Sequence, residues 1–244
     1  MGIAIEVKDL SVKYKELKKM TIKQSLLHFK LNRSEQFEAL KGVSFSVEKG
    51  KILGIVGKNG SGKSTMLRAI AGIFSPDSGS IDLKGNTVSL MSIGTGFQNK
   101  LTGFENIILA GLLMGFTEEQ IRAKAPEIIE FAGLGDFIYK PVRTYSSGMY
   151  SKLAFSITAL LETDIMLIDE VLSVGDIQFR EKSGKKMREI IADENRTVVI
   201  VSHSMGTLLE LCDEILWLHD GEVREIGDPQ TVAHNYETFM KNLK

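Results

Sequence analysis

Apolar and polar side chains alternate along residues 3 to 14 and again along residues 43 to 48. An alternation with a period of two predicts strands that bury one face, and these two are expected to begin the fold as an antiparallel pair. Residues 52 to 56 form a short apolar run and predict a third, buried strand. The N-terminal region is therefore expected to consist mainly of strands.

The segment between the first two predicted strands breaks this alternation. From about residue 15 to residue 38 the pattern is helical and basic. Ile22, Leu26 and Phe29 are spaced along one helical face. Residues 15 to 33 carry six basic side chains and one acidic one, a local net charge of +5. We interpret the segment as an insertion into the β region.

The middle of the chain is predicted to be helical and the part after it to alternate strands and helices. Residues 103 to 160 place apolar side chains at helical spacing. The apolar runs 165 to 168 and 198 to 201 predict buried parallel strands, separated by a helix over about residues 177 to 192. This order predicts an α/β fold with a parallel sheet.

A hairpin is predicted near the end of the chain. Two short strands, over residues 214 to 218 and 222 to 226, flank the dipeptide Asp220-Gly221. A two-residue turn of this kind needs positive φ at both central residues, and Asp-Gly suits it. We expect a tight turn there.

Composition and charge narrow the class of protein. The chain has 244 residues, of which 43% are apolar, enough for a substantial core. Its 30 basic and 31 acidic side chains nearly cancel, so no global charge favours nucleic acid. Cys212, the single cysteine, excludes an intrachain disulfide and a paired-cysteine zinc site, and we expect it to pack as a small apolar side chain. No stretch approaches the ~20 apolar residues that span a bilayer, and no signal peptide is recognised, so we expect a cytoplasmic protein.

A phosphate-binding motif follows the third predicted strand and precedes a helical pattern, which is the context that a P-loop requires. Glycine amides and the helix N-terminus can surround phosphate oxygens, Lys63 adds a full positive charge, and Ser64 is placed to bind Mg²⁺. We call residues 57–65 the phosphate loop; it consists of Gly57, Lys58, Asn59, Gly60, Ser61, Gly62, Lys63, Ser64 and Thr65.

Polar residues with matching chemistry end two of the predicted parallel strands. Asp169 and Glu170 follow the run 165 to 168, and His203 follows the run 198 to 201. Asp169 can hold a metal ion, and Glu170 can orient or deprotonate the water that attacks a γ-phosphate. His203 can bond a γ-phosphate oxygen. Because parallel strands share one carboxyl edge, these residues are expected to lie beside the phosphate loop.

The order of these motifs, with Tyr145-Ser146-Ser147-Gly148-Met149 before a helix and residues 173 to 176 after Glu170, resembles the ABC transporter ATPase family. The usual family signature has two glycines and then glutamine, where this chain has Ser147 and Met149. The residues of these two motifs, 145 to 149 and 173 to 176, and the insertion after Tyr14 resemble the branch that exports teichoic acids and O-antigen polysaccharides.

This resemblance implies a P-loop α/β core, a small antiparallel β lobe and a helical lobe over about residues 97–160, all in one domain of residues 1–244. It implies ATP and Mg²⁺ as cofactors. Tyr14 would stack on adenine, although it could also be a packing residue of the first strand. Ser146, Ser147 and Gly148 would act on the ATP of the opposite subunit. Gln98 would be a metal ligand in the loop that faces the membrane partner.

The implied protein is the ATP-hydrolysing subunit of an exporter, a homodimer with two transmembrane subunits, peripheral on the cytoplasmic face of the cell membrane and without a nucleic-acid partner. The expected cargo is a lipid-linked polymer, teichoic acid ahead of O-antigen because no glycan-binding domain is recognised. The alternatives are a transporter ATPase for a lipid or drug, a soluble ABC ATPase, and a non-catalytic nucleotide switch. The basic insertion suits a membrane headgroup layer or the membrane partner, or else a helix packed on its own β lobe.

Overall fold

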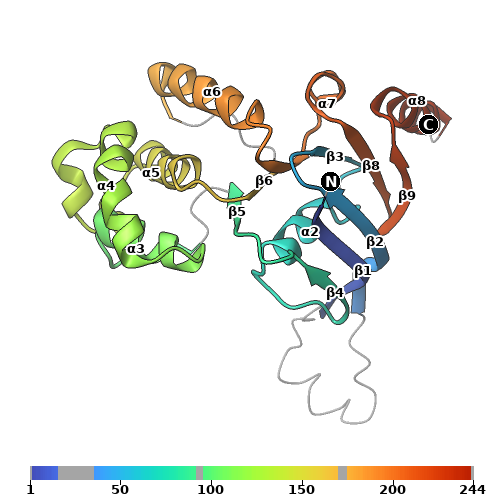
Figure 1. Cartoon of the computed structure of the whole chain (residues 1–244), viewed down its shortest axis with the longest axis horizontal. Coiled ribbons are helices and arrows are strands. Elements are labelled where there is room, and N and C mark those ends of the chain that lie inside the picture. The colour runs from blue at the N-terminus through green and yellow to red at the C-terminus, as the bar shows by residue number, and fades with distance from the viewer. Residues whose placement is uncertain (1, 16–35, 92–95, 170–174, 243–244) are drawn as a thin grey trace, which may run out of the picture.

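The structure is a computed structural model of the whole chain, and it describes residues 2–15, 36–91, 96–169 and 175–242 (Figure 1). The strands are β1 (Ile3–Lys15), β2 (Gln36–Glu48), β3 (Ile52–Val56), β4 (Ser78–Asp82), β5 (Val88–Met91), β6 (Ile165–Asp169), β7 (Thr197–Val201), β8 (Glu214–His219) and β9 (Glu222–Gly227). The helices are α2 (Lys63–Ile70), α3 (Gly103–Leu113), α4 (Glu118–Ala132), α5 (Ser147–Leu160), α6 (Ile177–Ile191), α7 (Met205–Leu211) and α8 (Pro229–Asn242), with short 3-10 turns at Gly135–Tyr139 and Val142–Thr144.

The N-terminal strands form a small antiparallel sheet in the order β2-β1-β4. Alternating residues of β1 and β2, such as Ile5, Leu10 and Leu40, are fully buried. They join one core with Leu53 and Leu67, from β3 and α2. The predicted antiparallel β lobe is confirmed, and it packs directly against the strand and helix that flank the phosphate loop.

A second sheet has six strands in the order β5-β6-β7-β3-β8-β9. The strands β5, β6, β7, β3 and β8 run parallel, which confirms the prediction for the runs 165 to 168 and 198 to 201. Both faces of this sheet are covered, one by helices and the other by α2 and the β lobe, and residues of β6 and β7 are almost entirely apolar. β9 runs antiparallel to β8. The turn between them has φ values of 49° at Asp220 and 85° at Gly221, which confirms the predicted hairpin.

The helices α3, α4 and α5 form a separate group at the left of Figure 1, and we call this group the helical lobe. Its core contains Ile107 from α3, Ile121 and Ile128 from α4, and Leu153 and Ile157 from α5. The other helices, α6, α7 and α8, cover the face of the six-stranded sheet opposite the β lobe. No helix within the described ranges is long and apolar enough to cross a membrane.

The predicted helical insertion begins too early and ends too late. Lys15 belongs to β1, and residues 36–38 belong to β2, where Phe37 pairs with Tyr14 and Glu38 pairs with Lys13. The two strands extend until they reach the insertion, because each supplies the other's backbone hydrogen bonds. Residues 16–35, which hold the rest of the predicted helix, lie outside the described residues.

Candidate active site

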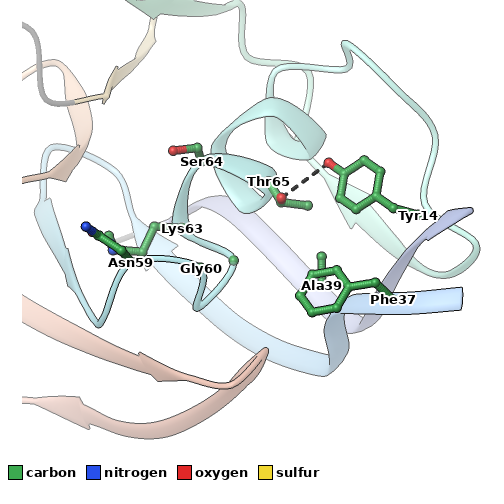
Figure 2. Close-up of a pocket in the computed structure, with 9 residues that line it drawn as sticks. Tyr14, Phe37, Ala39, Asn59, Gly60, Lys63, Ser64 and Thr65 are labelled. Atoms are coloured by element: carbon green, nitrogen blue, oxygen red, sulfur yellow. Dashed lines mark hydrogen bonds between the residues drawn. The ribbon is translucent and has the colours of Figure 1, made fainter. Parts of the chain in front are cut away.

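The phosphate loop links the carboxyl end of β3 to α2 (Figure 2). Two of its glycines are required by their surroundings. A Cβ atom at Gly57 would lie 2.2 Å from the backbone oxygen of Leu218, and one at Gly62 would lie 2.5 Å from that of Ala39. Gly60 has φ of 82°, and a Cβ atom there would meet no atom within 4 Å. The loop is therefore closely packed at Gly57 and Gly62 and open at Gly60, where a phosphate could approach.

Lys63 is the first residue of α2, and only 6% of its surface is exposed. Its ammonium group donates hydrogen bonds to the backbone oxygens of Gly57 at 2.7 Å and Lys58 at 2.9 Å. These bonds curl the loop around the lysine and hold its charge beside the helix N-terminus. Positive charge at this point suits a phosphate group.

Ser64 and Asp169 meet at the carboxyl edge of the six-stranded sheet. The hydroxyl of Ser64 donates a hydrogen bond of 3.2 Å to Oδ1 of Asp169. Hydroxyl and carboxylate oxygens are ligands that Mg²⁺ accepts, usually together with substrate phosphates and water. Within the described residues no three His, Cys, Asp or Glu side chains gather as a metal site. The pair therefore fits an ion whose remaining ligands come from a bound phosphate.

A pocket of about 310 Å³ opens beside the phosphate loop and reaches the β lobe. Tyr14 and Phe37 lie at its end away from Lys63 (Figure 2). The hydroxyl groups of Tyr14 and Thr65 are 3.3 Å apart, and the Tyr14 ring packs edge-to-face on Phe74. Both pocket aromatics are partly exposed, 42% for Tyr14 and 58% for Phe37. This arrangement can hold an aromatic base at one end and phosphates at the other.

Phe37 was not among the residues that the sequence analysis proposed, because the helical pattern was extended through residue 38. Its alternation with Ala39, which also lines the pocket, is the signal that could have identified it. Asn106 was also missed. Asn106 is fully buried, and it bonds both the backbone N–H and the backbone oxygen of Gln98.

Other predicted site residues lie apart from this pocket. Ser146 caps α5 by accepting a 3.2 Å hydrogen bond from the N–H of Met149, and Ser147 and Gly148 begin that helix in the helical lobe. Figure 1 shows α5 well separated from α2. Gln98 is exposed, and its backbone N–H donates a hydrogen bond to the side chain of Asn106. His203 is exposed just beyond β7, and Glu170 lies outside the described residues. One subunit therefore does not bring the phosphate loop and the predicted signature residues together.

The architecture and the phosphate loop have counterparts in known proteins. A family model described as ABC transporter matches residues 40–173. The chain belongs to the ABC transporter family. Solved structures with a similar fold include an ATP-binding subunit of an ABC transporter, with a TM-score of 0.72 and 23% identity over 96% of this chain and 93% of that one. A second is a dimeric, post-hydrolysis ATP-binding cassette bound to ADP and Pi, with a TM-score of 0.68 and 22% identity over 92% of this chain and 98% of that one.

Curated relatives carry export names. The chain is 44% identical to a teichoic acids export ATP-binding protein of Bacillus anthracis, over 99% of this chain and 44% of the relative. It is 44% identical to an O-antigen export system ATP-binding protein of Myxococcus xanthus, over 81% of this chain and 45% of the relative. It is 40% identical to a teichoic acids export ATP-binding protein of Staphylococcus haemolyticus, over 100% of this chain and 92% of the relative. This ABC transporter chain thus spans less than half the length of the first two relatives.

Proposed function

We propose that the chain is the ATP-binding and ATP-hydrolysing subunit of an ABC exporter. The observation that carries the proposal is the contact between Ser64 and Asp169 beside the buried ammonium group of Lys63. Lys63 would bind the β- and γ-phosphates, and the aromatic end of the pocket would receive adenine. Ser64 and Asp169 would hold Mg²⁺, which neutralises phosphate charge when it is bound.

Glu170 follows Asp169 directly, and we assign to it the orientation or deprotonation of the attacking water. His203, at the carboxyl end of the neighbouring strand β7, would bond a γ-phosphate oxygen. Gln98 stays a proposed metal ligand; its backbone is fixed at the start of the helical lobe by Asn106. Phosphoryl transfer depends chiefly on positioning and charge stabilisation, which this set of side chains could supply.

The chain would act as a homodimer. In the helix α5, Gly148 has no neighbour that requires a glycine, since a Cβ atom there would approach only Oγ of Ser146, at 3.9 Å. A glycine in a helix costs stability relative to alanine, so its presence points to a close approach from outside the subunit. The phosphates of an ATP held by the opposite subunit would be that neighbour. Two transmembrane subunits would complete the exporter, with the ATPase peripheral to the membrane.

The proposed cargo is a lipid-linked surface polymer, with teichoic acid first and O-antigen second. The support for it is the names of the Bacillus, Staphylococcus and Myxococcus relatives. The extent of the match does not separate the two cargoes, because the chain covers similar shares, 44% and 45%, of the Bacillus and Myxococcus relatives. Expression in a host lacking its teichoic acid export ATPase, and in one lacking its O-antigen export ATPase, separates them by which polymer returns to the surface.

The activity itself is tested with purified protein. Wild-type chain should hydrolyse ATP in the presence of Mg²⁺, and Lys63→Ala should abolish ATP binding. Glu170→Gln should retain ATP binding while turnover falls by a factor of roughly 10² or more. ATP binding without any turnover in the wild type, alone and with its membrane partner, would instead support a nucleotide switch.

A further inference from the structure

The turn between β8 and β9 touches both walls of the nucleotide pocket. The N–H of Gly221 donates a 3.1 Å hydrogen bond to the backbone oxygen of Ser61, in the phosphate loop. The backbone oxygen of Gly221 accepts a 2.9 Å hydrogen bond from the N–H of Lys41, in β2. The two peptide groups that flank Gly221 therefore connect the phosphate loop to β2, the strand that carries Phe37 and Ala39.

The contact leaves no room for a side chain. A Cβ atom at Gly221 would lie 2.9 Å from the backbone oxygen of Ala39 and 3.4 Å from Cγ of Lys41. Gly221 also has φ of 85°, a conformation that favours glycine. Ala39 is held between the turn and the phosphate loop, because its backbone oxygen would also lie 2.5 Å from a Cβ atom at Gly62. The position of β2 relative to the loop thus depends on how closely the turn approaches it.

The phosphate loop is supported by β8 and by a bond within the loop, whereas β2 near Lys41 is held by an irregular ladder with β1, which has register shifts between Leu10 and Lys13. The backbone oxygen of Leu218 lies against Gly57, and the N–H of Ser61 bonds the backbone oxygen of Lys58 at 3.2 Å. A change at Gly221 that pushes on Ala39 should therefore displace β2 more than the loop. The expected result is a change in the separation between the phosphate site and the aromatic end of the pocket.

We propose that Gly221 is a positioning residue of the nucleotide pocket, which fixes the distance between the phosphate loop and the base-side strand β2. The role rests on the proposed binding of ATP in this pocket. The turn should therefore contribute to the affinity for a whole nucleotide, which contacts both walls of the pocket. It should contribute little to the affinity for a triphosphate group alone.

The test compares Gly221→Ala with Gly85→Ala. Gly85 also lies in a turn with positive φ, 76°, but it is exposed, and a Cβ atom there would meet nothing within 4 Å. Both variants carry similar backbone strain, and only the first pushes on β2.

Dissociation constants are measured for ATP and for inorganic tripolyphosphate, together with the midpoint of thermal unfolding. Gly221→Ala should weaken ATP binding by about tenfold relative to Gly85→Ala and change tripolyphosphate binding by about twofold or less. In turnover, KM for ATP should rise while kcat changes little.

A second variant covers the case in which Gly221→Ala does not fold. Lys41→Pro removes the N–H that bonds Gly221 without adding an atom to the turn, and Leu40 before it is already extended in a strand. It should show the same larger loss for ATP than for tripolyphosphate. Equal ATP affinity in Gly221→Ala and Gly85→Ala, or parallel losses for ATP and tripolyphosphate, would overturn the positioning role. Failure of the wild type to bind ATP would overturn the proposed function instead.

Discussion

At the scale of single residues, the pocket separates charge from aromatic surface. Lys63 is buried, and its ammonium group donates to the carbonyl oxygens of Gly57 and Lys58 beside the N-terminus of α2. Positive charge at this end would attract a phosphate group. Tyr14 and Phe37 remain partly exposed at the other end, where apolar surface gains most from being covered. The free energy of nucleotide binding should therefore divide between these two ends.

The contribution of the aromatic end can be measured by substitution. Tyr14→Ala and Phe37→Ala should each weaken ATP binding by roughly 5- to 150-fold, since stacking of a base on an aromatic ring contributes about 1–3 kcal/mol. Tyr14→Phe keeps the ring and loses only the exposed 3.3 Å contact with Thr65, so its affinity should stay within about twofold of wild type. Ile73→Ala, an exposed apolar residue outside the pocket lining, is the control. An unchanged affinity in Phe37→Ala would remove that residue from the site.

At the scale of elements, the described residues that lead into the helical lobe, 96–102, are held by hydrogen bonds to α3. The helix α3 begins with a capping box, in which Thr102 accepts from the N–H of Glu105 and the carboxylate of Glu105 accepts from the N–H of Thr102. These bonds to its carboxylate hold the pKa of Glu105 below its usual value. The side chain of Asn106 then satisfies backbone groups of the residues that precede the cap.

Asn106 should be important for stability because its bonds are buried. Its amide group donates to the backbone oxygens of Gln98, Leu101 and Thr102, and its carbonyl oxygen accepts from Gln98 N–H at 2.8 Å. Asn106→Leu would leave these groups without that partner and should lower the free energy of unfolding by about 2–3 kcal/mol, measured by urea denaturation. Asn99→Leu, at an exposed position in the same segment, should change it by less than about 0.5 kcal/mol. Similar losses in both variants would contradict this account.

A charged contact joins α5 to α6. Nζ of Lys152 lies 2.5 Å from Oδ2 of Asp176, and Oδ1 of Asp176 caps α6 by accepting from the N–H of Phe179 at 2.9 Å. Lys152 first, and then this cap, hold the pKa of Asp176 below its ordinary value of 3.8. A carboxyl group whose pKa is lower in the folded state stabilises the fold above its unfolded pKa, and the effect is lost as pH falls through the folded pKa.

The contact predicts a pH-dependent difference between variants. Asp176→Asn keeps an oxygen for the cap and loses the charge, so its stability deficit relative to wild type should be constant near neutral pH. The deficit should shrink as pH falls below 3.8, where the unfolded chain binds the proton first, and should disappear as the folded carboxylate is protonated at its lower pKa. Asp176→Ala should show a further loss of stability at all pH values, because the cap is also removed. Thermal unfolding between about pH 7 and pH 3 measures both effects. A deficit that grows on acidification would contradict the assignment of the shift to Lys152.

The elements were more predictable than the contacts between them. Apolar runs identified the parallel strands β6 and β7, and the Asp220-Gly221 dipeptide identified the hairpin of β8 and β9, because burial and turn geometry leave a direct trace in the order of residues. The end of the insertion was placed wrongly, since residues 36–38 alternate over too short a length to outweigh a neighbouring helical pattern. The bonds of Gly221 to Ser61 and Lys41 leave no periodic signal, because they join segments that are distant in sequence. The motif around Gly148 was visible, but only the structure indicated that its own subunit does not need a glycine there.

At the scale of the whole molecule, the two halves of the proposed catalytic site are on different parts of one subunit. The phosphate loop lies against both sheets, at Ala39 of β2 and Leu218 of β8, and the signature residues Ser146–Gly148 lie in the helical lobe. Lys152 and Asp176 tie that lobe to α6, and Phe155 of α5 packs on Phe179 of α6, so movements of the lobe should be transmitted to the core through these two helices. A second copy of the chain could bring its own helical lobe to the ATP of the first. A defect in the phosphate loop of one subunit and a defect in the signature residues of the other would then fall on the same ATP and leave the second ATP site intact.

Complementation between two inactive variants tests this arrangement. Lys63→Ala removes the phosphate-binding charge, and Gly148→Asp places a carboxylate where the opposite subunit's phosphates are expected, so each pure variant should be nearly inactive. Gly148→Asp should still fold with near wild-type stability, because a Cβ atom at this position meets nothing closer than 3.9 Å. In a mixed dimer one site combines an intact phosphate loop with an intact signature, and ATP turnover should recover to a measurable fraction of wild type. Gly148→Ala is the matched control for size without charge, and it should bind ATP while hydrolysing it more slowly. Full turnover by pure Gly148→Asp would contradict a shared site, since repulsion between the carboxylate and the phosphates could not then occur.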